Sequence, residues 1–385
     1  MRRKKNRNII YLTILLLSFQ TSVFAQSFPI PDPPIIGAKS YLLIDSVTGK
    51  DLATYEPDML LAPASLTKLM TAYVIFNALQ QEQITLEDEV TVSEKAWRTE
   101  GSRMFIEVGK KILVEDLILG MIVQSGNDAS VALAEHVAGT ESLFAEIMNQ
   151  YAFSLGMHST KFSNSTGLPH ENHYTTARDL SILTRAIINE FPDYYRWYSI
   201  KEFRHNGILQ KNRNTLLWRD PSVDGMKTGL TEEAGYCLVS SANREGMRII
   251  SIVMGTATER ARTDGSQALL NYGFRFYETK LIYKAQKKIS DIRIWKSQKE
   301  VTELGIAEDL YLTIPRGSFD KIELIKEIPS LFAGNVEKGQ EIGKLKISLD
   351  EKIIATLPLE ALEENPYGSL WQRLRDTIQL WFENE

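Results

Sequence analysis

The 385-residue chain has a single cysteine, Cys237, and only five histidines. One thiol cannot form an internal disulfide, and the histidines show neither an H-E-x-x-H run nor a Cys/His set with zinc spacing, so we expect no metal site. Acidic residues outnumber basic ones by 49 to 44, which argues against a nucleic-acid partner. With 43% hydrophobic and 24% charged residues, the composition also excludes a disordered or low-complexity chain. The length suggests two or three domains.

Residues 1–25 have the composition of a secretory signal. Five basic residues and no acidic ones lie in this segment, and they precede an apolar run from Ile9 to about Phe19. That run is shorter than the roughly 20 residues that span a bilayer, and Val23-Phe24-Ala25 supplies small residues for cleavage. We expect a signal peptide over 1–25 and an exported protein, with an uncleaved anchor as the alternative. No cysteine follows the apolar run, which excludes a lipoprotein anchor.

Residues 26–280 predict one α/β (α+β) domain. Helical periodicity begins near Ser65, and helical segments dominate to about Arg219. A closing helix is expected over Gly265–Tyr272. Strand patterns are expected in five segments: Lys39–Asp45, Lys50–Tyr55, Met226–Leu230, Gly235–Ala242 and Met247–Gly255. These positions predict an antiparallel five-stranded sheet that is assembled from both ends of the domain.

The pattern of apolar residues changes in the C-terminal part of the chain. Residues 281–362 show alternating apolar residues, as in Leu310–Ile314 and Leu345–Leu349, and predict a small β-rich domain. Residues 363–385 predict an amphipathic helix with an apolar stripe: Leu370, Trp371, Leu374, Ile378, Trp381 and Phe382. A helix of this type lies in a membrane interface, and we favour a membrane surface as its partner. Packing on its own β domain, or on another protein, remains the alternative.

A serine and a lysine three residues apart open the first expected helix. On a helix the side chains at i and i+3 share a face, which brings the Lys68 amine within reach of the Ser65 hydroxyl. Ser65 follows Pro63 at the helix N-terminus, where free N–H groups favour developing negative charge. Because a serine nucleophile needs an adjacent base, Lys68 can serve only if burial or a nearby cation lowers its pKa.

Two further motifs follow in the chain. Ser125-Gly126-Asn127 lies between helical stretches, where the serine can relay a proton and the asparagine can hold a substrate amide. Lys227-Thr228-Gly229 lies on an expected strand, where the lysine and threonine can bind a carboxylate and the glycine admits a close backbone approach. Alone, each motif is equally compatible with a polar loop, a helix cap or a solvated strand.

Spacing alone is weak evidence in this chain. Ser318 and Lys321 repeat the first spacing, but there an expected strand would place them on opposite faces. The three motifs in this order are far more specific. Together they resemble the signature of serine penicillin-binding proteins and β-lactamases. The surrounding residues resemble those of low-molecular-mass penicillin-binding proteins, the serine-type D-alanyl-D-alanine carboxypeptidases: Pro63–Thr71, Ser125–Ala129, Val223–Gly229 and Leu269–Thr279.

The resemblance covers essentially the whole chain after residue 25, and it implies a penicillin-binding/β-lactamase-like catalytic domain. It implies a peptidase that removes the terminal D-alanine from peptidoglycan stem peptides at the periplasmic face of the bacterial inner membrane, as a peripheral protein. Ser65 would attack the D-alanyl-D-alanine carbonyl and Lys68 would take its proton. The family needs no metal or organic cofactor, and β-lactams act as covalent inhibitors of it.

The resemblance also implies roles for the remaining motif residues. The backbone N–H groups of Ser65 and Leu230 would form the oxyanion hole beside Gly229. Proton return to the leaving D-alanine would use Ser125 and Lys227, and Asn127 would orient the substrate amide. The substrate carboxylate would bind Thr228 and Arg262, although Arg260 lies only two positions from Arg262.

Two departures from close relatives concern the pocket wall. Leu230 and Thr166 stand where such relatives often carry histidine, which leaves fine substrate preference and deacylation rate open. Three alternatives remain at this point: a D,D-endopeptidase of the same fold, a β-lactamase and a non-catalytic cell-wall scaffold. The E-x-x-L-N run of class A β-lactamases is absent, and the long C-terminal extension also argues against that alternative.

Overall fold

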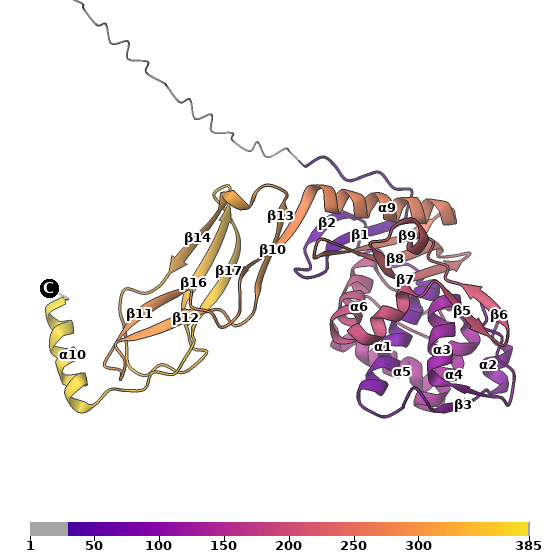
Figure 1. Ribbon diagram of the computed structural model, residues 1–385, viewed down its shortest axis with the longest axis horizontal. Coiled ribbons are helices and arrows are strands. Elements are labelled where there is room, and N and C mark those ends of the chain that lie inside the picture. Colours follow the sequence, from indigo (N-terminus) through magenta and orange to yellow (C-terminus); the bar gives the residue numbers. More distant parts are fainter. Residues whose placement is uncertain (1–29, 384–385) are drawn as a thin grey trace, which may run out of the picture.

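The structure is a computed structural model that describes residues 30–383, so the signal peptide expected over 1–25 lies outside the described residues. A mixed α/β region and a β-rich region follow one another along the long axis of the molecule (Figure 1). Helix α10 (Leu370–Glu383) lies at the end remote from the α/β region. This division into a helix-and-sheet region and a β region confirms the expected fold class.

A five-stranded antiparallel sheet forms the centre of the α/β region, with strand order β2-β1-β9-β8-β7. The strands are β1 (Ser40–Asp45), β2 (Asp51–Tyr55), β7 (Val223–Thr231), β8 (Gly235–Arg244) and β9 (Met247–Thr256). Strands from the two ends of the region meet where β1 pairs with β9. This pairing assembles the sheet from both ends of the region, as predicted.

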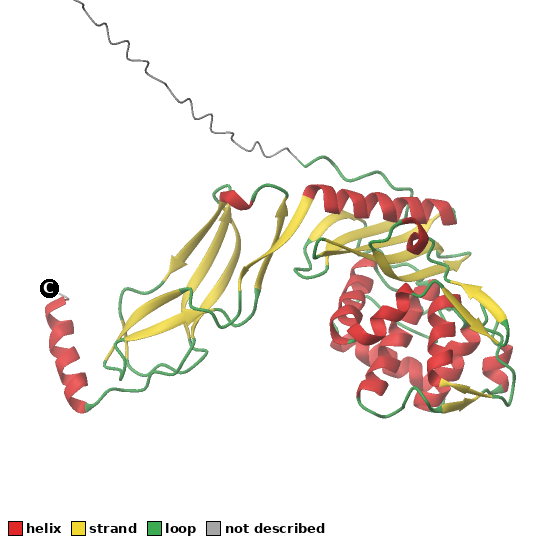
Figure 2. Ribbon diagram, in the orientation of Figure 1, coloured by secondary structure: helices red, strands yellow, loops and turns green. Residues whose placement is uncertain are grey.

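Helices cover both faces of this sheet (Figure 2). Successive side chains of a strand point to opposite faces. Accordingly Leu42 and Ile44 of β1 belong to the large core between the sheet and the helical segment. Leu43 belongs to a smaller core on the opposite face, between the sheet and α9 (Glu259–Phe276). The helices of the segment between β2 and β7 are α1 (Lys68–Gln80), α2 (Glu94–Arg98), α3 (Val114–Leu119), α4 (Asn127–Ala138), α5 (Glu141–Ser154), α6 (Ala177–Glu190), α7 (Pro192–Tyr195) and α8 (Leu216–Arg219).

Short elements complete the helical segment. Two small antiparallel pairs are β3 (Glu89–Thr91) with β4 (Lys111–Leu113), and β5 (Glu202–His205) with β6 (Ile208–Lys211). The 3-10 turns are η1 (Ala64–Thr67) and η3 (Arg196–Ser199), and η2 (Gly120–Gln124) is a π-helical turn. Both η1 and η2 lead directly into residues of the predicted site.

The β-rich region has its own apolar core and two sheets. One sheet pairs β10 (Tyr277–Tyr283) with β13 (Leu310–Pro315). The six-stranded sheet contains β11 (Ser290–Trp295), β12 (Val301–Gly305), β14 (Ile322–Glu327), β15 (Phe332–Ala333), β16 (Glu341–Leu349) and β17 (Lys352–Ala361). The expected strand over Ser318–Lys321 is wrong, because Phe319–Lys321 forms a 3-10 turn (η4) whose Lys321 N–H donates to the Ser318 carbonyl.

Polar residues join the two regions. The Thr279 hydroxyl of β10 donates to the Asp45 carboxylate at the end of β1 over 2.7 Å. Thr48, in the turn after β1, contacts Thr313 of β13 through hydroxyl groups 2.7 Å apart. The turn that closes the β1–β2 hairpin therefore also contacts the β-rich region.

Helix α10 contacts the β region with its polar side. Asp376 is 5% exposed, and its carboxylate accepts the backbone N–H of Lys296 over 2.7 Å. The apolar stripe faces the opposite way, with Trp371 81% and Trp381 72% exposed. Among the helices that the structure describes, none combines the length and apolar character needed to cross a membrane.

Candidate active site

The nucleophile candidate Ser65 lies in η1, a 3-10 turn that precedes α1. The expected α-helix therefore begins three residues later than Ser65, at Lys68. Ala64, the first residue of this turn, adopts a left-handed φ of 47°. Lys68 still approaches from the following turn, with its Nζ 3.2 Å from the Ser65 Oγ.

The Lys68 amine is buried among oxygen atoms. Its Nζ lies 2.7 Å from the Asn127 Oδ1 and 2.6 Å from the backbone carbonyl oxygen of Thr166. Burial lowers the pKa of Lys68 to about 7, with a further lowering from the Arg213 charge and opposing contributions from Asp128 and Glu141. A neutral amine near pH 7 can accept a proton from a serine hydroxyl.

A second serine–lysine pair faces the same cleft. Ser125 directly follows the π-helical turn η2, and its φ of 65° is left-handed. The Ser125 Oγ accepts a hydrogen bond of 2.9 Å from the Nζ of Lys227, which lies on β7 and also donates to the Thr228 carbonyl. Burial, and then the positive charges of Lys68, Arg213 and Arg262, lower the pKa of Lys227.

Asn127 and Asp128 begin α4 and secure the loop before β4. The Asn127 Nδ2 donates to the carbonyl oxygen of Glu100. The Asp128 carboxylate accepts backbone N–H groups from Met104, Phe105 and Ala129. These bonds place Gly101, Ser102 and Phe105 at the wall of the cleft.

A cleft of about 830 Å³ opens above Ser65. Residues predicted from the sequence that line it are Ser65, Ser125, Asn127, Thr228, Gly229, Leu230 and Arg262. Lys68 and Lys227 lie beneath this lining, at 1% and 2% exposure. The structure thus brings all nine predicted residues to one place from η1, α1, η2, α4, β7 and α9.

The edge strand β7 forms one wall of the cleft. A side chain at Gly229 would meet the Pro63 carbonyl oxygen at 3.2 Å, which explains why glycine fits this contact with η1. Leu230 is half exposed at the mouth of the cleft. The Arg262 guanidinium donates to the Gly229 carbonyl oxygen over 3.3 Å, whereas Arg260 pairs with Asp264 outside the lining.

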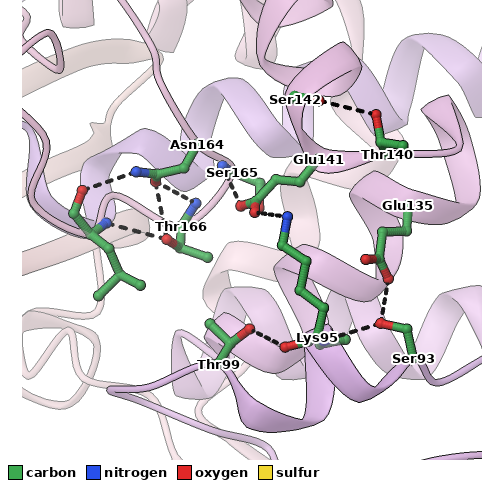
Figure 3. Close-up of polar contacts among 12 residues, drawn as sticks. Ser93, Lys95, Thr99, Glu135, Thr140, Glu141, Ser142, Asn164, Ser165 and Thr166 are labelled. Atoms are coloured by element: carbon green, nitrogen blue, oxygen red, sulfur yellow. Dashed lines mark hydrogen bonds and ion pairs between the residues drawn. The ribbon is translucent and has the colours of Figure 1, made fainter.

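Three further residues of the site carried no clear signal in the sequence. The Thr166 carbonyl contacts Lys68, a role that was not indicated by its standing where relatives carry histidine. Arg213 lines the cleft and affects both buried lysines. Glu141 contacts Ser165, the neighbour of Thr166 (Figure 3). None of these belongs to the three motifs: Thr166 and Arg213 lie in loops, and Glu141 lies in the first turn of α5.

Metal ligation has no support within residues 30–383, where no group of three or more His, Cys, Asp and Glu side chains could hold an ion. The chemistry available is instead that of a serine with an adjacent neutral amine and a second proton relay. A serine with an adjacent buried lysine of lowered pKa in a cleft defines a serine-type acyl-transfer site.

Comparison with known proteins identifies the family. Residues 28–258 match the D-alanyl-D-alanine carboxypeptidase family, and residues 277–366 match the C-terminal domain of penicillin-binding protein 5. The chain belongs to this family and is a serine-type D-alanyl-D-alanine carboxypeptidase. The predicted family, enzyme class and fold are thereby confirmed.

Individual relatives are similar to this chain over most of its length. The D-alanyl-D-alanine carboxypeptidase DacA of Escherichia coli K12 is 41% identical over 362 residues, covering 92% of this chain and 90% of that protein. The crystal structure of penicillin binding protein 5 from Haemophilus influenzae has a TM-score of 0.85 and 42% identity, covering 87% of this chain and 99% of that one. Penicillin-binding protein D2 from Listeria monocytogenes in its ampicillin-bound form has a TM-score of 0.59 and 29% identity, and covers 63% of this chain and 100% of that one.

Proposed function

We propose that this carboxypeptidase removes the terminal D-alanine from peptidoglycan stem pentapeptides through an acyl-enzyme on Ser65. The observation that carries the proposal is the pair of serine–lysine contacts, Ser65 with Lys68 and Ser125 with Lys227, at one cleft. The first pair supplies an activated nucleophile. The second supplies a proton donor for the leaving group.

Acylation begins when the neutral Lys68 amine takes the Ser65 proton and the Ser65 Oγ attacks the carbonyl between the two D-alanines. The negative charge of the tetrahedral intermediate is held by the backbone N–H groups of Ser65 and Leu230, and each such donor typically contributes about 10²–10³ in rate. Ser125, hydrogen bonded to Lys227, passes a proton to the departing D-alanine amine. A water molecule then hydrolyses the acyl-enzyme.

Substrate binding uses the β7 wall. The terminal carboxylate binds the Thr228 hydroxyl and the Arg262 guanidinium, both of which line the cleft. Asn127 orients the substrate amide with the remaining N–H and lone pair of its side chain, because Lys68 and the Glu100 carbonyl occupy only one acceptor and one donor position.

β-Lactams are expected to acylate the same serine, as mimics of the D-alanyl-D-alanine end. The ampicillin-bound and cefotaxime-bound structures of the Listeria relative support this expectation. The test is mass spectrometry of the chain after incubation with benzylpenicillin. We expect one penicilloyl group, located on the peptide that contains Ser65, and slow release of the adduct. Rapid release would favour a β-lactamase, and an adduct at another serine would refute the assignment.

We further propose that the protein is exported and attached peripherally to the periplasmic face of the inner membrane by α10. The two exposed tryptophans of its apolar stripe support this attachment, because tryptophan favours the interface between lipid and water. Co-sedimentation with lipid vesicles is expected for the full chain and not after deletion of residues 370–385. Replacing Trp371 and Trp381 with alanine should also abolish it, whereas Trp97→Ala, at an exposed tryptophan of α2, should not. Equal sedimentation of all variants would refute the attachment.

A further inference from the structure

Glu141 is a largely buried carboxylate to which the mechanism above gives no role. It lies in the first turn of α5, and its side chain is 12% exposed. One carboxylate oxygen accepts the backbone N–H of Ser165 over 3.1 Å and the Ser165 hydroxyl over 2.7 Å. The other lies 2.8 Å from the Lys95 Nζ, so the carboxylate connects α2 with the loop before Thr166 (Figure 3).

The peptide that follows Ser165 is held at each polar group. The Ser165 carbonyl accepts the Thr71 hydroxyl of α1 over 2.7 Å. The Asn164 Oδ1 accepts the N–H groups of Thr166 and Gly167, over 3.1 Å and 2.7 Å. These contacts fix the direction of the next carbonyl, that of Thr166. That carbonyl oxygen lies 2.6 Å from the Lys68 Nζ, the shortest hydrogen bond of this amine.

We propose that Glu141 is a positioning residue for the carboxypeptidase reaction, which holds Ser165 by its N–H and hydroxyl so that the next carbonyl, that of Thr166, orients the Lys68 amine toward Ser65. The inference rests on the proposed role of Lys68 as the base. Glu141 contacts Ser165, and the next residue along the backbone, Thr166, contacts Lys68. Because Glu141 does not touch the reacting atoms, it is distinct from the catalytic residues.

Charge gives the same carboxylate a second effect on Lys68. The charged groups that act on this amine are Asp128 and Glu141, which raise its pKa, and Arg213, which lowers it. Lys68 in turn lowers the pKa of its neighbours Lys227 and His173. Burial acts to raise the pKa of Glu141, but hydrogen bonds from Lys95 and Ser165 outweigh it and hold that pKa below its ordinary value. Glu141 is therefore ionised at neutral pH, and its removal should lower the pKa of Lys68.

Two substitutions separate the positioning from the charge. Glu141→Gln keeps an acceptor for Ser165 and removes the charge, so we expect a plateau of kcat/KM near that of the native chain. Its acidic limb should move to lower pH, because the loss of this negative charge lowers the pKa of Lys68. Glu141→Ala leaves the buried N–H and hydroxyl of Ser165 without this acceptor, and kcat/KM should fall at least about tenfold at every pH.

The experiment measures D-alanine release from a peptide ending in D-Ala-D-Ala between pH 5.5 and 9, normalised to sites labelled by fluorescent penicillin. Glu135→Gln is the matched control. It removes the same charge from a carboxylate in the neighbouring contact with Ser93, 2.6 Å from that hydroxyl, and should reproduce the native profile (Figure 3).

Distinct results would overturn the inference. Native profiles for both Glu141 variants would do so. So would a lower melting temperature of Glu141→Ala with unchanged kcat/KM per labelled site, since that shows a merely structural role. If Glu141→Ala does not fold, Ser165→Ala decides: loss of the hydroxyl that donates to Glu141 should lower kcat/KM per labelled site, and a native value would overturn the positioning role. If Lys68 is not the base, the result differs from all of these. Lys68→Ala would then still release D-alanine, and its kcat/KM would still fall at acidic pH.

Discussion

Acidification is expected to switch the enzyme off around neutral pH. The lowered pKa of Lys68, about 7 instead of 10.5, means that its neutral form is gained as the pH rises through 7. With that pKa, about 0.9 of the lysine is neutral at pH 8 and about 0.1 at pH 6, so kcat/KM should fall roughly tenfold between them. A lysine with the ordinary pKa would be only about 0.3% neutral at pH 8, and activity would rise about tenfold per unit through pH 9.

The assay is initial-rate release of D-alanine from a D-Ala-D-Ala peptide at constant ionic strength, with the active fraction measured by penicillin labelling at each pH. The acidic limb of the kcat/KM profile reports the pKa of groups in the free enzyme. Because Lys68 and Lys227 interact, the limb belongs to the pair and not to either residue alone. A profile that is flat between pH 6 and 8, or that still climbs tenfold per unit at pH 9, would refute Lys68 as a buried neutral base.

Three further predictions concern the loop packing, the substrate carboxylate and the base. Gly167→Ala would place a Cβ 1.8 Å from the Ala64 carbonyl oxygen at a φ of 87°, so the melting temperature should fall by several degrees, and an unchanged value would contradict the packing of this loop on η1. Arg262→Gln should lower kcat/KM about 10–100-fold by loss of a charge-assisted contact with the substrate carboxylate, while Arg260→Gln should not; equal effects would refute the choice between them. Lys68→Ala should abolish turnover while the chain stays folded by circular dichroism, and release of D-alanine at the native rate would show that another group is the base.

The sheet and its helices were largely predictable because their signals are local. The apolar run of β1 and the turn before β2 indicate a hairpin in the sequence itself, and the structure contains both. The start of the first helix was less predictable. Pro63 and Ser65 suggested an α-helical N-terminus, but the close approach of Gly167 to Ala64 accompanies a 3-10 turn there. Such a contact between distant segments leaves no periodic pattern.

The site residues also differ in whether a local pattern marks them in the sequence. The three motifs carried side chains that the structure brings together, yet spacing alone would have chosen Ser318 and Lys321 equally. The Thr166 carbonyl is a backbone atom that any residue could supply. Glu141 and Arg213 act over distances that only the folded chain defines. Sequence patterns therefore indicated the reacting groups, while the groups that set their pKa and orientation required the structure.

The most direct test of the central claim compares D-alanine release by the native chain with that by Ser65→Ala, on a peptide ending in D-Ala-D-Ala. We expect turnover by the native chain and none by the variant. Equal turnover by the variant would contradict Ser65 as the nucleophile. No release by the native chain, despite a penicillin adduct on Ser65, would contradict the carboxypeptidase activity and favour an endopeptidase or a scaffold.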